Sequence, residues 1–142
     1  MIRYFNEDTD FALYGKANAK RWLKEVAMRE GKRIGNINII FCSDPYLLDI
    51  NRRFLSHDYY TDIITFDDCE ENTLNGDLFI SIDTVRANAD EYAQGRFEEE
   101  LNRVMVHGIL HLIGYDDHSE EEQQLMRSKE NEYLALKEEL ER

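Results

Sequence analysis

Two kinds of hydrophobic pattern follow one another along the chain. Apolar residues recur at helical spacing over residues 16–30, 45–54, 83–95, 97–113 and 119–140. Shorter segments rich in β-branched and aromatic residues, typical of strands, occupy residues 2–5, 36–42, 61–66 and 77–82. In segment 36–42 the residues Ile37, Ile39 and Phe41 alternate with their neighbours, which indicates an internal strand, and segment 2–5 is expected at an edge.

Capping and turn residues mark the predicted boundaries of several elements. Asp83 is a candidate N-cap, and Ser119-Glu-Glu-Glu122 has the form of a capping box. Gly114 follows the last periodic residue of its helix and predicts a helix end. Asn75-Gly76 predicts the turn that makes a hairpin of strands 61–66 and 77–82. In the last helix, the residues expected to face inward are Leu125, Met126, Tyr133, Leu136 and Leu140.

Together these elements predict an α+β fold, a small mixed β-sheet packed with about five α-helices. The 142 residues are expected to form a single domain, residues 1–142, because the chain contains no repeat or linker. Hydrophobic residues make up 42% of the chain and Pro45 is its only proline, which favours a compact fold. We expect no signal peptide and no membrane-spanning segment, and therefore a cytoplasmic location.

The charge is strongly acidic but unevenly distributed. Seventeen basic and thirty acidic residues give a net charge of −13, which disfavours indiscriminate binding to phosphate backbones. Residues 16–33 carry seven Lys or Arg and two acidic residues, whereas residues 119–142 carry eight acidic and four basic residues. An acidic protein can therefore still present a basic face, although a solvated helix surface is an equally good interpretation.

The densest group of candidate functional residues is the segment His107-Gly-Ile-Leu-His111-Leu-Ile-Gly114-Tyr-Asp-Asp-His118. Two histidines four residues apart lie on one helix face and can reach a common ion. After Gly114 the chain can fold back and bring a third ligand from Asp116, Asp117 or His118. Imidazole and carboxylate ligands without a nearby cysteine suit Zn²⁺ best, with Ni²⁺, Mn²⁺ and Fe²⁺ as alternatives. The sequence thus predicts one metal site at the end of a central helix.

A metal held by three protein ligands keeps a position for water, which is typical of catalytic zinc. In zinc peptidases with His-x-x-x-His, a glutamate directly after the first histidine acts as general base, but here that residue is Gly108. A peptidase is therefore disfavoured. Metal-assisted hydrolysis of a phosphodiester requires less from the protein, although these residues alone do not select the substrate.

The segment HGILHLIGYDDH resembles the HGxLHLxGYDH signature of the YbeY family of bacterial endoribonucleases. The resemblance extends upstream to the segment from Asn51 to Phe66 and to the strand Gly76-Asp-Leu-Phe-Ile-Ser81, in the order that the family has them. It implies a single-strand-specific, metal-dependent endoribonuclease acting in maturation of small-subunit ribosomal RNA, at its 3′ end, and in ribosome quality control. It also implies a zinc ion held by three histidines, with ribosomal RNA and the small ribosomal subunit as partners.

The chain departs from the family pattern at the third ligand. In the family the third histidine lies ten residues after the first, but here that position is Asp117, and His118 follows it. The predicted metal ligands are therefore His107, His111 and His118, or Asp117 in place of His118. An aspartate ligand would bring negative charge to the ion and make its bound water less acidic.

A second departure is Leu55, because the family has an arginine at that position. Arg52 or Arg53 could supply a guanidinium group instead, although solvated helix charges are the favoured interpretation of both. No general acid can be named from the sequence. Leu55 and the acidic composition favour one alternative from another class, a ribosome-associated assembly factor with a structural metal and little nuclease activity.

Overall fold

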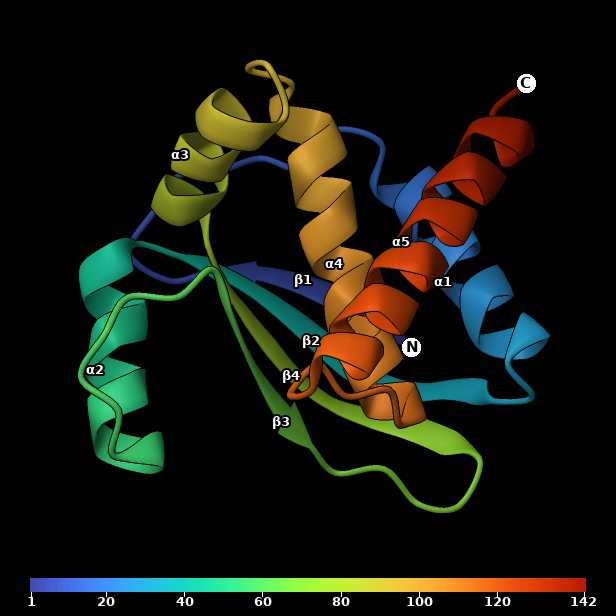
Figure 1. The fold of residues 1–142 in the computed structure, drawn as a ribbon, viewed down its shortest axis with the longest axis horizontal. Coiled ribbons are helices and arrows are strands. Elements are labelled where there is room, and N and C mark those ends of the chain that lie inside the picture. The colour runs from blue at the N-terminus through green and yellow to red at the C-terminus, as the bar shows by residue number, and fades with distance from the viewer.

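The computed structural model describes residues 1–142, which form four strands and five helices (Figure 1). The strands are β1 (Ile2–Asn6), β2 (Arg33–Cys42), β3 (Ile63–Asp67) and β4 (Thr73–Ser81). The helices are α1 (Lys16–Arg29), α2 (Asp44–Leu55), α3 (Ile82–Tyr92), α4 (Phe97–Ile113) and α5 (Glu120–Leu140). The predicted α+β class, with a small mixed sheet and five helices, is confirmed.

The four strands form one sheet in the order β1-β2-β4-β3. β2 lies between β1 and β4 and is parallel to both, whereas β3 runs antiparallel to β4. The predictions of β1 as an edge strand, β2 as an internal strand and a hairpin of β3 with β4 are therefore confirmed.

The hairpin turn does not lie at Asn75-Gly76, as the sequence suggested, because both residues belong to β4. The chain reverses at Glu71 and Asn72, where Glu70 and Thr73 exchange backbone hydrogen bonds of 3.1 and 2.8 Å. Glu71 adopts a left-handed conformation with φ 50°. A non-glycine residue thus supplies the left-handed backbone, and β4 begins at Thr73, four residues before the strand start that the Asn-Gly signal indicated.

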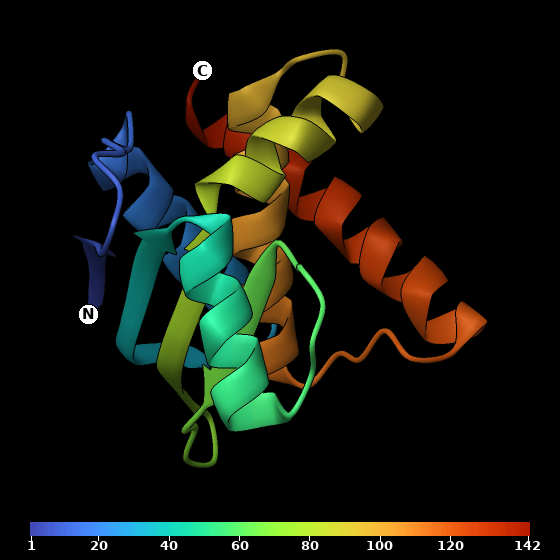
Figure 2. The ribbon, with the colours of Figure 1, turned by 90° about the vertical axis from the view of Figure 1, so that its left-hand side faces the viewer.

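Helices cover both faces of the sheet. The larger core lies on one face, where strand residues such as Ile37, Ile39 and Leu78 pack against α1, α3, α4 and α5. On the other face, Leu47 and Ile50 of α2 pack with Cys42 and Ile64. Figure 2 shows α2 in front of the strands and α4 behind them. The alternation predicted for residues 36–42 is confirmed, since Ile37, Ile39 and Phe41 face the larger core whereas Cys42 packs on the other face.

Helix α4 passes through the middle of the larger core. Its buried residues are Leu101, Val104, Met105, Val106, Gly108, Ile109, Leu110 and Leu112. A Cβ atom at Gly108 would lie 2.8 Å from Ile63 Cδ1 and 2.9 Å from Leu78 Cδ1. Glycine at this position therefore lets α4 approach β3 and β4 more closely than any other residue would allow.

The capping box of α5 is confirmed, because Ser119 and Glu122 exchange side-chain and backbone hydrogen bonds. Two local predictions were wrong. The N-cap of α3 is Ser81, which accepts from the Thr84 amide, whereas Asp83 accepts from the backbone amide of Asp44 at 3.0 Å. Leu125 is 49% exposed, because the buried stripe of α5 follows Met126, Tyr133 and Leu136.

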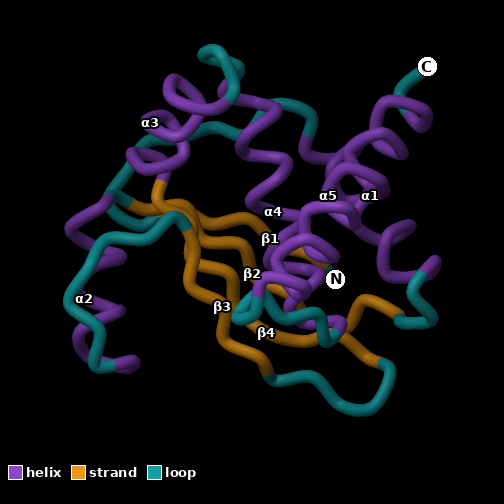
Figure 3. Tube along the Cα trace, viewed as in Figure 1, coloured by secondary structure: helices purple, strands orange, loops and turns teal.

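The segment between α2 and β3, residues 56–62, runs back along α2 to the start of β3 (Figure 3). Ser56 begins this reversal with a left-handed backbone, φ 56°. None of the helices combines the length and the hydrophobicity that a membrane crossing requires.

We expect Gly76→Ala to destabilise the fold by at least about 2 kcal/mol. Gly76 has φ 154°, and an added Cβ would lie 2.3 Å from the backbone oxygen of Phe66 in the neighbouring strand. Backbone strain and overpacking each cost about 1–3 kcal/mol. The free energy of unfolding, from urea titration followed by circular dichroism, measures the loss.

Gly31→Ala is the matched control, because Gly31 also has a left-handed backbone, φ 77°, but no atom within 4 Å of an added Cβ. We expect it to cost only about 1 kcal/mol. Equal losses in the two variants would contradict the steric explanation.

Candidate metal centre

His107 and His111 stand on the one side of α4 that the core leaves open. Their side chains are 22% and 24% exposed, in a helix whose other central residues are buried. The two Nε2 atoms lie 3.0 Å apart, because residues four apart are neighbours on a helix surface. The predicted pairing of these side chains is present in the structure.

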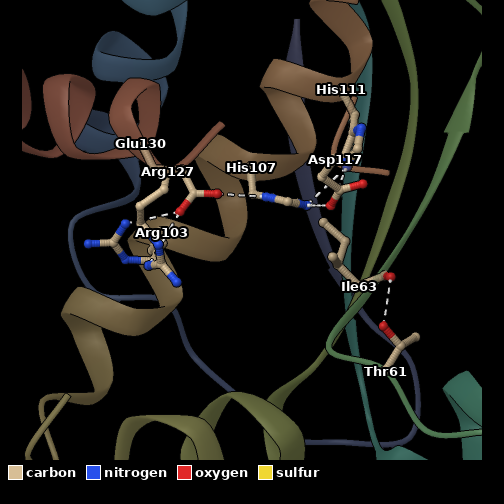
Figure 4. A network of polar contacts seen from close by, with 8 residues as sticks. All are labelled: Thr61, Ile63, Arg103, His107, His111, Asp117, Arg127 and Glu130. Carbon is tan, nitrogen blue, oxygen red and sulfur yellow. Dashed lines mark hydrogen bonds and ion pairs between the residues drawn. The ribbon is translucent and has the colours of Figure 1, made fainter. Parts of the chain in front are cut away.

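Asp117 joins them from the segment that follows α4. Gly114, at φ 125°, ends the helix, and the chain then turns back toward the histidines. Asp117 Oδ2 lies 3.3 Å from His107 Nε2 and 3.5 Å from His111 Nε2. Three donor atoms from two segments therefore converge on one point (Figure 4).

The spacing of these donor atoms fits a metal ion. Ligand atoms about 2.0–2.1 Å from a tetrahedral zinc ion lie roughly 3.3 Å from one another. The observed separations of 3.0, 3.3 and 3.5 Å bracket that value. Two imidazoles and one carboxylate also form the kind of donor set that binds Zn²⁺ with a position left for water. His107, His111 and Asp117 can thus hold one ion.

The buried residue Glu130 orients His107 from helix α5. Its Oε2 lies 2.7 Å from His107 Nδ1, and its Oε1 accepts a 3.0 Å hydrogen bond from Arg103 Nη1 (Figure 4). An ionised carboxylate only accepts hydrogen bonds, so this contact places a proton on Nδ1 and turns Nε2 toward the site. Carboxylates commonly hold metal-binding histidines in this way.

Electrostatics keep this carboxylate ionised. Burial alone would raise the pKa of Glu130, but hydrogen bonds from His107 and Arg103 outweigh it and lower the pKa. Burial likewise favours the neutral form of His107, yet the hydrogen bond and charge of Glu130, with Asp62 and Asp117, raise the pKa of this histidine. The histidine therefore lies in a negative environment that favours a cation.

A second carboxylate, the partly buried Glu30 at the end of α1, anchors the segment that carries Asp117. Tyr115 Oη donates to Glu30 Oε1 at 2.6 Å, and Tyr133 Oη and Lys129 Nζ donate to Oε2. Burial raises the pKa of Glu30, but these three hydrogen bonds outweigh it and lower the pKa. Tyr115 is thereby fixed two residues before Asp117.

The donor atoms open into a cleft with a volume of about 570 Å³ between α4 and the β3 side of the molecule. We name it the histidine cleft. It is lined by Asn51, Leu55, His57, Tyr59, Thr61, Asp62, Ile63, Ile64, Thr65, Asp67, His107, His111, Asp117 and His118. This set contains no lysine and no arginine, so the histidine cleft has no fixed cation of its own.

Asp62 is a third carboxyl group that acts on His107, besides Glu130 and Asp117. It lines the histidine cleft and an adjoining cleft that contains Arg103, Arg127 and Glu130. Burial raises the pKa of Asp62, against a smaller lowering by His107. Two carboxyl groups near one histidine thus differ in character, since Glu130 is ionised whereas Asp62 binds a proton more readily.

The structure brings some of the candidate residues into the cleft and not others. His118 is exposed and lines the histidine cleft, but it does not belong to the group of converging donors. Leu55 also lines the cleft. Arg52 and Arg53 are exposed, lie outside the lining and are ion-paired with Asp58 and Asp49. No residue of the basic segment 16–33 lines the cleft.

Glu130 and Asp62 were not identified as site residues from the sequence. Glu130 follows Met126 by four positions and precedes Tyr133 by three, so it falls on the buried stripe of α5. A charged residue within an apolar stripe needs a buried partner, and this signal could have found it. Asp62 carried no comparable signal, because its burial depends on how β3 packs against α4.

The family model and the similar proteins carry the same name, and one solved structure shares the fold. The family model described as "Endoribonuclease YbeY" matches residues 3–137. Proteins named "Endoribonuclease YbeY" from Phocaeicola vulgatus and Porphyromonas gingivalis are 51% and 47% identical, covering 96% and 95% of this chain and 98% and 89% of their own. The solution structure of TM1509 from Thermotoga maritima matches with TM-score 0.67 and 32% identity, over 94% of this chain and 87% of that one.

We expect Glu130→Gln to weaken zinc binding by about 10- to 100-fold, the usual effect of losing a partner of a metal-binding histidine. The amide is similar in size but lacks the charge that orients His107. Competition with a chromophoric chelator gives the dissociation constant. Glu132→Gln is the control, since Glu132 lies on the same helix with its side chain 54% exposed. Unchanged zinc affinity in Glu130→Gln would contradict this role.

We expect Glu30→Gln to lower the free energy of unfolding by about 1–3 kcal/mol at pH 7. Because folding lowers the pKa of Glu30 below its ordinary value of 4.5, its stabilisation is present above that value and is lost as pH falls through the folded pKa. The difference between the variant and the wild type should therefore shrink in urea titrations below pH 4.5. Glu25→Gln, at a surface ion pair on the same helix, should show neither effect.

Proposed function

Because the chain belongs to the YbeY endoribonuclease family, we propose that it is a metal-dependent hydrolase that cuts single-stranded RNA. Its proposed substrate is ribosomal RNA, at the 3′ end of the small-subunit RNA, and its proposed partner is the small ribosomal subunit. A role in ribosome quality control and a cytoplasmic location belong to the same proposal. The family assignment supports a nuclease, and the geometry of the candidate site supports the metal.

One observation carries the proposal: three donor atoms converge at the wall of an open cleft. A structural zinc is normally enclosed by four protein ligands, whereas a catalytic zinc has three and an accessible fourth position. His107, His111 and Asp117 make three, and all three line the histidine cleft. A substrate can therefore reach the position that the protein leaves open.

We assign Asp117 as the third ligand in preference to His118. Asp117 Oδ2 lies within 3.5 Å of both Nε2 atoms, whereas His118 does not belong to the converging group. A zinc ion bound there would supply Lewis-acid activation of water and stabilise charge on phosphoryl oxygens. His107 is oriented for binding by Glu130, and Asp117 is positioned by Tyr115 and Glu30.

Gly108 argues against peptidase chemistry for a structural reason. The residue after the first histidine faces Ile63 and Leu78 within the core, with no room even for a Cβ atom. A glutamate general base could not occupy this position without moving α4 away from the sheet. The helix packing therefore excludes the acid–base arrangement of zinc peptidases with His-Glu-x-x-His.

The cleft also supports a preference for single strands. Only a flexible strand can present one phosphodiester bond inside a recess, because a stiff duplex holds its bases paired and its phosphates on a convex surface. Thr61 and Thr65 supply neutral polar groups along the lining.

The alternative remains a ribosome assembly factor whose metal is structural. Leu55, which lines the histidine cleft at the position where the family has arginine, is the observation that favours it. The two functions differ in what the loss of a ligand does: a structural metal is required for folding, whereas a catalytic metal is required for cleavage.

We expect zinc-loaded protein to cut a labelled single-stranded RNA, and metal-free protein to be inactive. His111→Ala and Asp117→Ala should lose at least about 100-fold in rate, as expected when stabilisation of transition-state charge is removed. His118→Ala should retain most of the rate, because His118 lies outside the donor group. Gel analysis of the products measures the rates, with a peptide substrate as the negative control.

Melting temperatures of the same variants separate the alternatives. A His111→Ala protein that is folded, associates with small subunits and does not cut supports catalysis. A variant that loses stability and association together supports the assembly factor. Activity lost in His118→Ala but retained in Asp117→Ala would reverse our choice of third ligand.

A further inference from the structure

The histidine cleft poses a problem for RNA binding, because its lining contains Asp62, Asp67 and Asp117 but no lysine or arginine. Single-stranded RNA is bound elsewhere by two kinds of contact, cationic groups on phosphates and aromatic rings on bases. Arg52 and Arg53 lie outside the lining and are paired with acidic residues. Aromatic contacts therefore have to carry more of the binding in this cleft than is usual.

The histidine cleft contains one pair of stacked aromatic side chains. His57 and Tyr59 line the histidine cleft, and their rings are stacked, with centroids 5.1 Å apart and an interplanar angle of 20°. Tyr59 Oη lies 2.9 Å from His57 Nδ1, so a hydrogen bond adds to the stacking. Even so, Tyr59 is 56% exposed. One face of the Tyr59 ring can therefore be reached by a ligand in the cleft.

One buried residue of α2 hydrogen-bonds to the backbone of both aromatic residues. Asn51, 2% exposed, accepts a 3.1 Å hydrogen bond from the His57 amide through its backbone oxygen. Its side-chain Nδ2 donates to the Tyr59 backbone oxygen at 2.9 Å. Both aromatic residues are thus tied to the same helical turn, which reduces the entropy lost when a ligand orders them.

We propose that the His57–Tyr59 pair is a stacking platform for an unpaired base of single-stranded RNA, next to the metal centre. This inference rests on the proposed function and identifies the residues that select single strands. A base can continue the stack only when it is unpaired and can turn its face toward the ring. Every base has such a face, so the platform tolerates many sequences.

The platform also predicts an unusual dependence on salt. Each phosphate neutralised by lysine or arginine makes binding weaker as salt rises. Because the cleft lining contains no such residue, binding there depends on stacking and on the metal, and should respond only weakly to salt.

The test compares Tyr59→Leu, Tyr59→Phe and Tyr60→Leu in zinc-loaded protein. Tyr60 is the matched control, since it is adjacent and 62% exposed but does not line the cleft. The probe is a short single-stranded RNA carrying 2-aminopurine, whose fluorescence is quenched on stacking, with anisotropy for affinity. We expect Tyr59→Leu to weaken binding by about 5- to 150-fold and to abolish the quenching. Tyr59→Phe and Tyr60→Leu should retain both.

A second arm uses an RNA with one abasic residue at each position in turn. At the position that occupies the platform, wild-type protein and Tyr59→Leu should bind the abasic RNA equally well. In steady-state cleavage, Tyr59→Leu should raise KM by a similar factor with little change in kcat, because stacking contributes equally to binding before and during reaction.

The outcomes separate this inference from the proposed function. If the wild type cuts RNA but Tyr59→Leu binds and quenches as the wild type does, the platform is overturned and the nuclease stands. The platform is also overturned if Tyr60→Leu loses as much affinity as Tyr59→Leu. Quenching that depends on Tyr59 in a protein that does not cut would support the platform and refute the nuclease.

Discussion

The close contact between α4 and the sheet at Gly108 is the constraint on which the rest of the structure depends. Because this position has no side chain, Ile63 and Leu78 reach the helix backbone, and nearly every neighbouring helix residue is buried. Only one narrow side of the helix remains open, and it carries His107 and His111. The packing that stabilises the core therefore also sets the histidines at the edge of the cleft beside β3.

Helix α5 fixes both parts of the donor group, the histidines of α4 and the segment that carries Asp117. Glu130 reaches His107 directly, while Lys129 and Tyr133, its neighbours on the same helix, bind Glu30. Glu30 in turn holds Tyr115 and the segment that leads to Asp117. Two ligands on different segments are thus aligned by the last helix of the chain, so the geometry of the site depends on correct docking of that helix.

Much of the fold was predictable because it follows from local patterns. Helical periodicity, the glycine after α4 and the capping box of α5 depend on residues close in sequence. The errors arose where distant contacts decide. The hairpin turn lies at Glu71 and Asn72, and not at Asn75-Gly76 as predicted, because β4 extends through Gly76 to Thr73. Likewise, the pairing of His107 with His111 follows from helical spacing, but the contacts of Asp62, Glu130 and Tyr59 depend on packing between separate elements.

The acidic composition of the chain affects how a phosphate backbone could approach the metal centre. With a net charge of −13 and three aspartates in a cleft without lysine or arginine, the chain alone repels a phosphate backbone. Under the proposed function, a bound divalent ion would bring positive charge into the histidine cleft itself, whereas Arg103 and Arg127 line only the adjoining cleft. Metal and RNA binding would then be coupled, because each raises the affinity for the other. Leu55 lines the cleft without contributing a charge, so this coupling would depend on the ion. Under the proposed function, stacking would hold a base of the RNA, and the ion would be needed in addition to hold the phosphate beside His107 and His111.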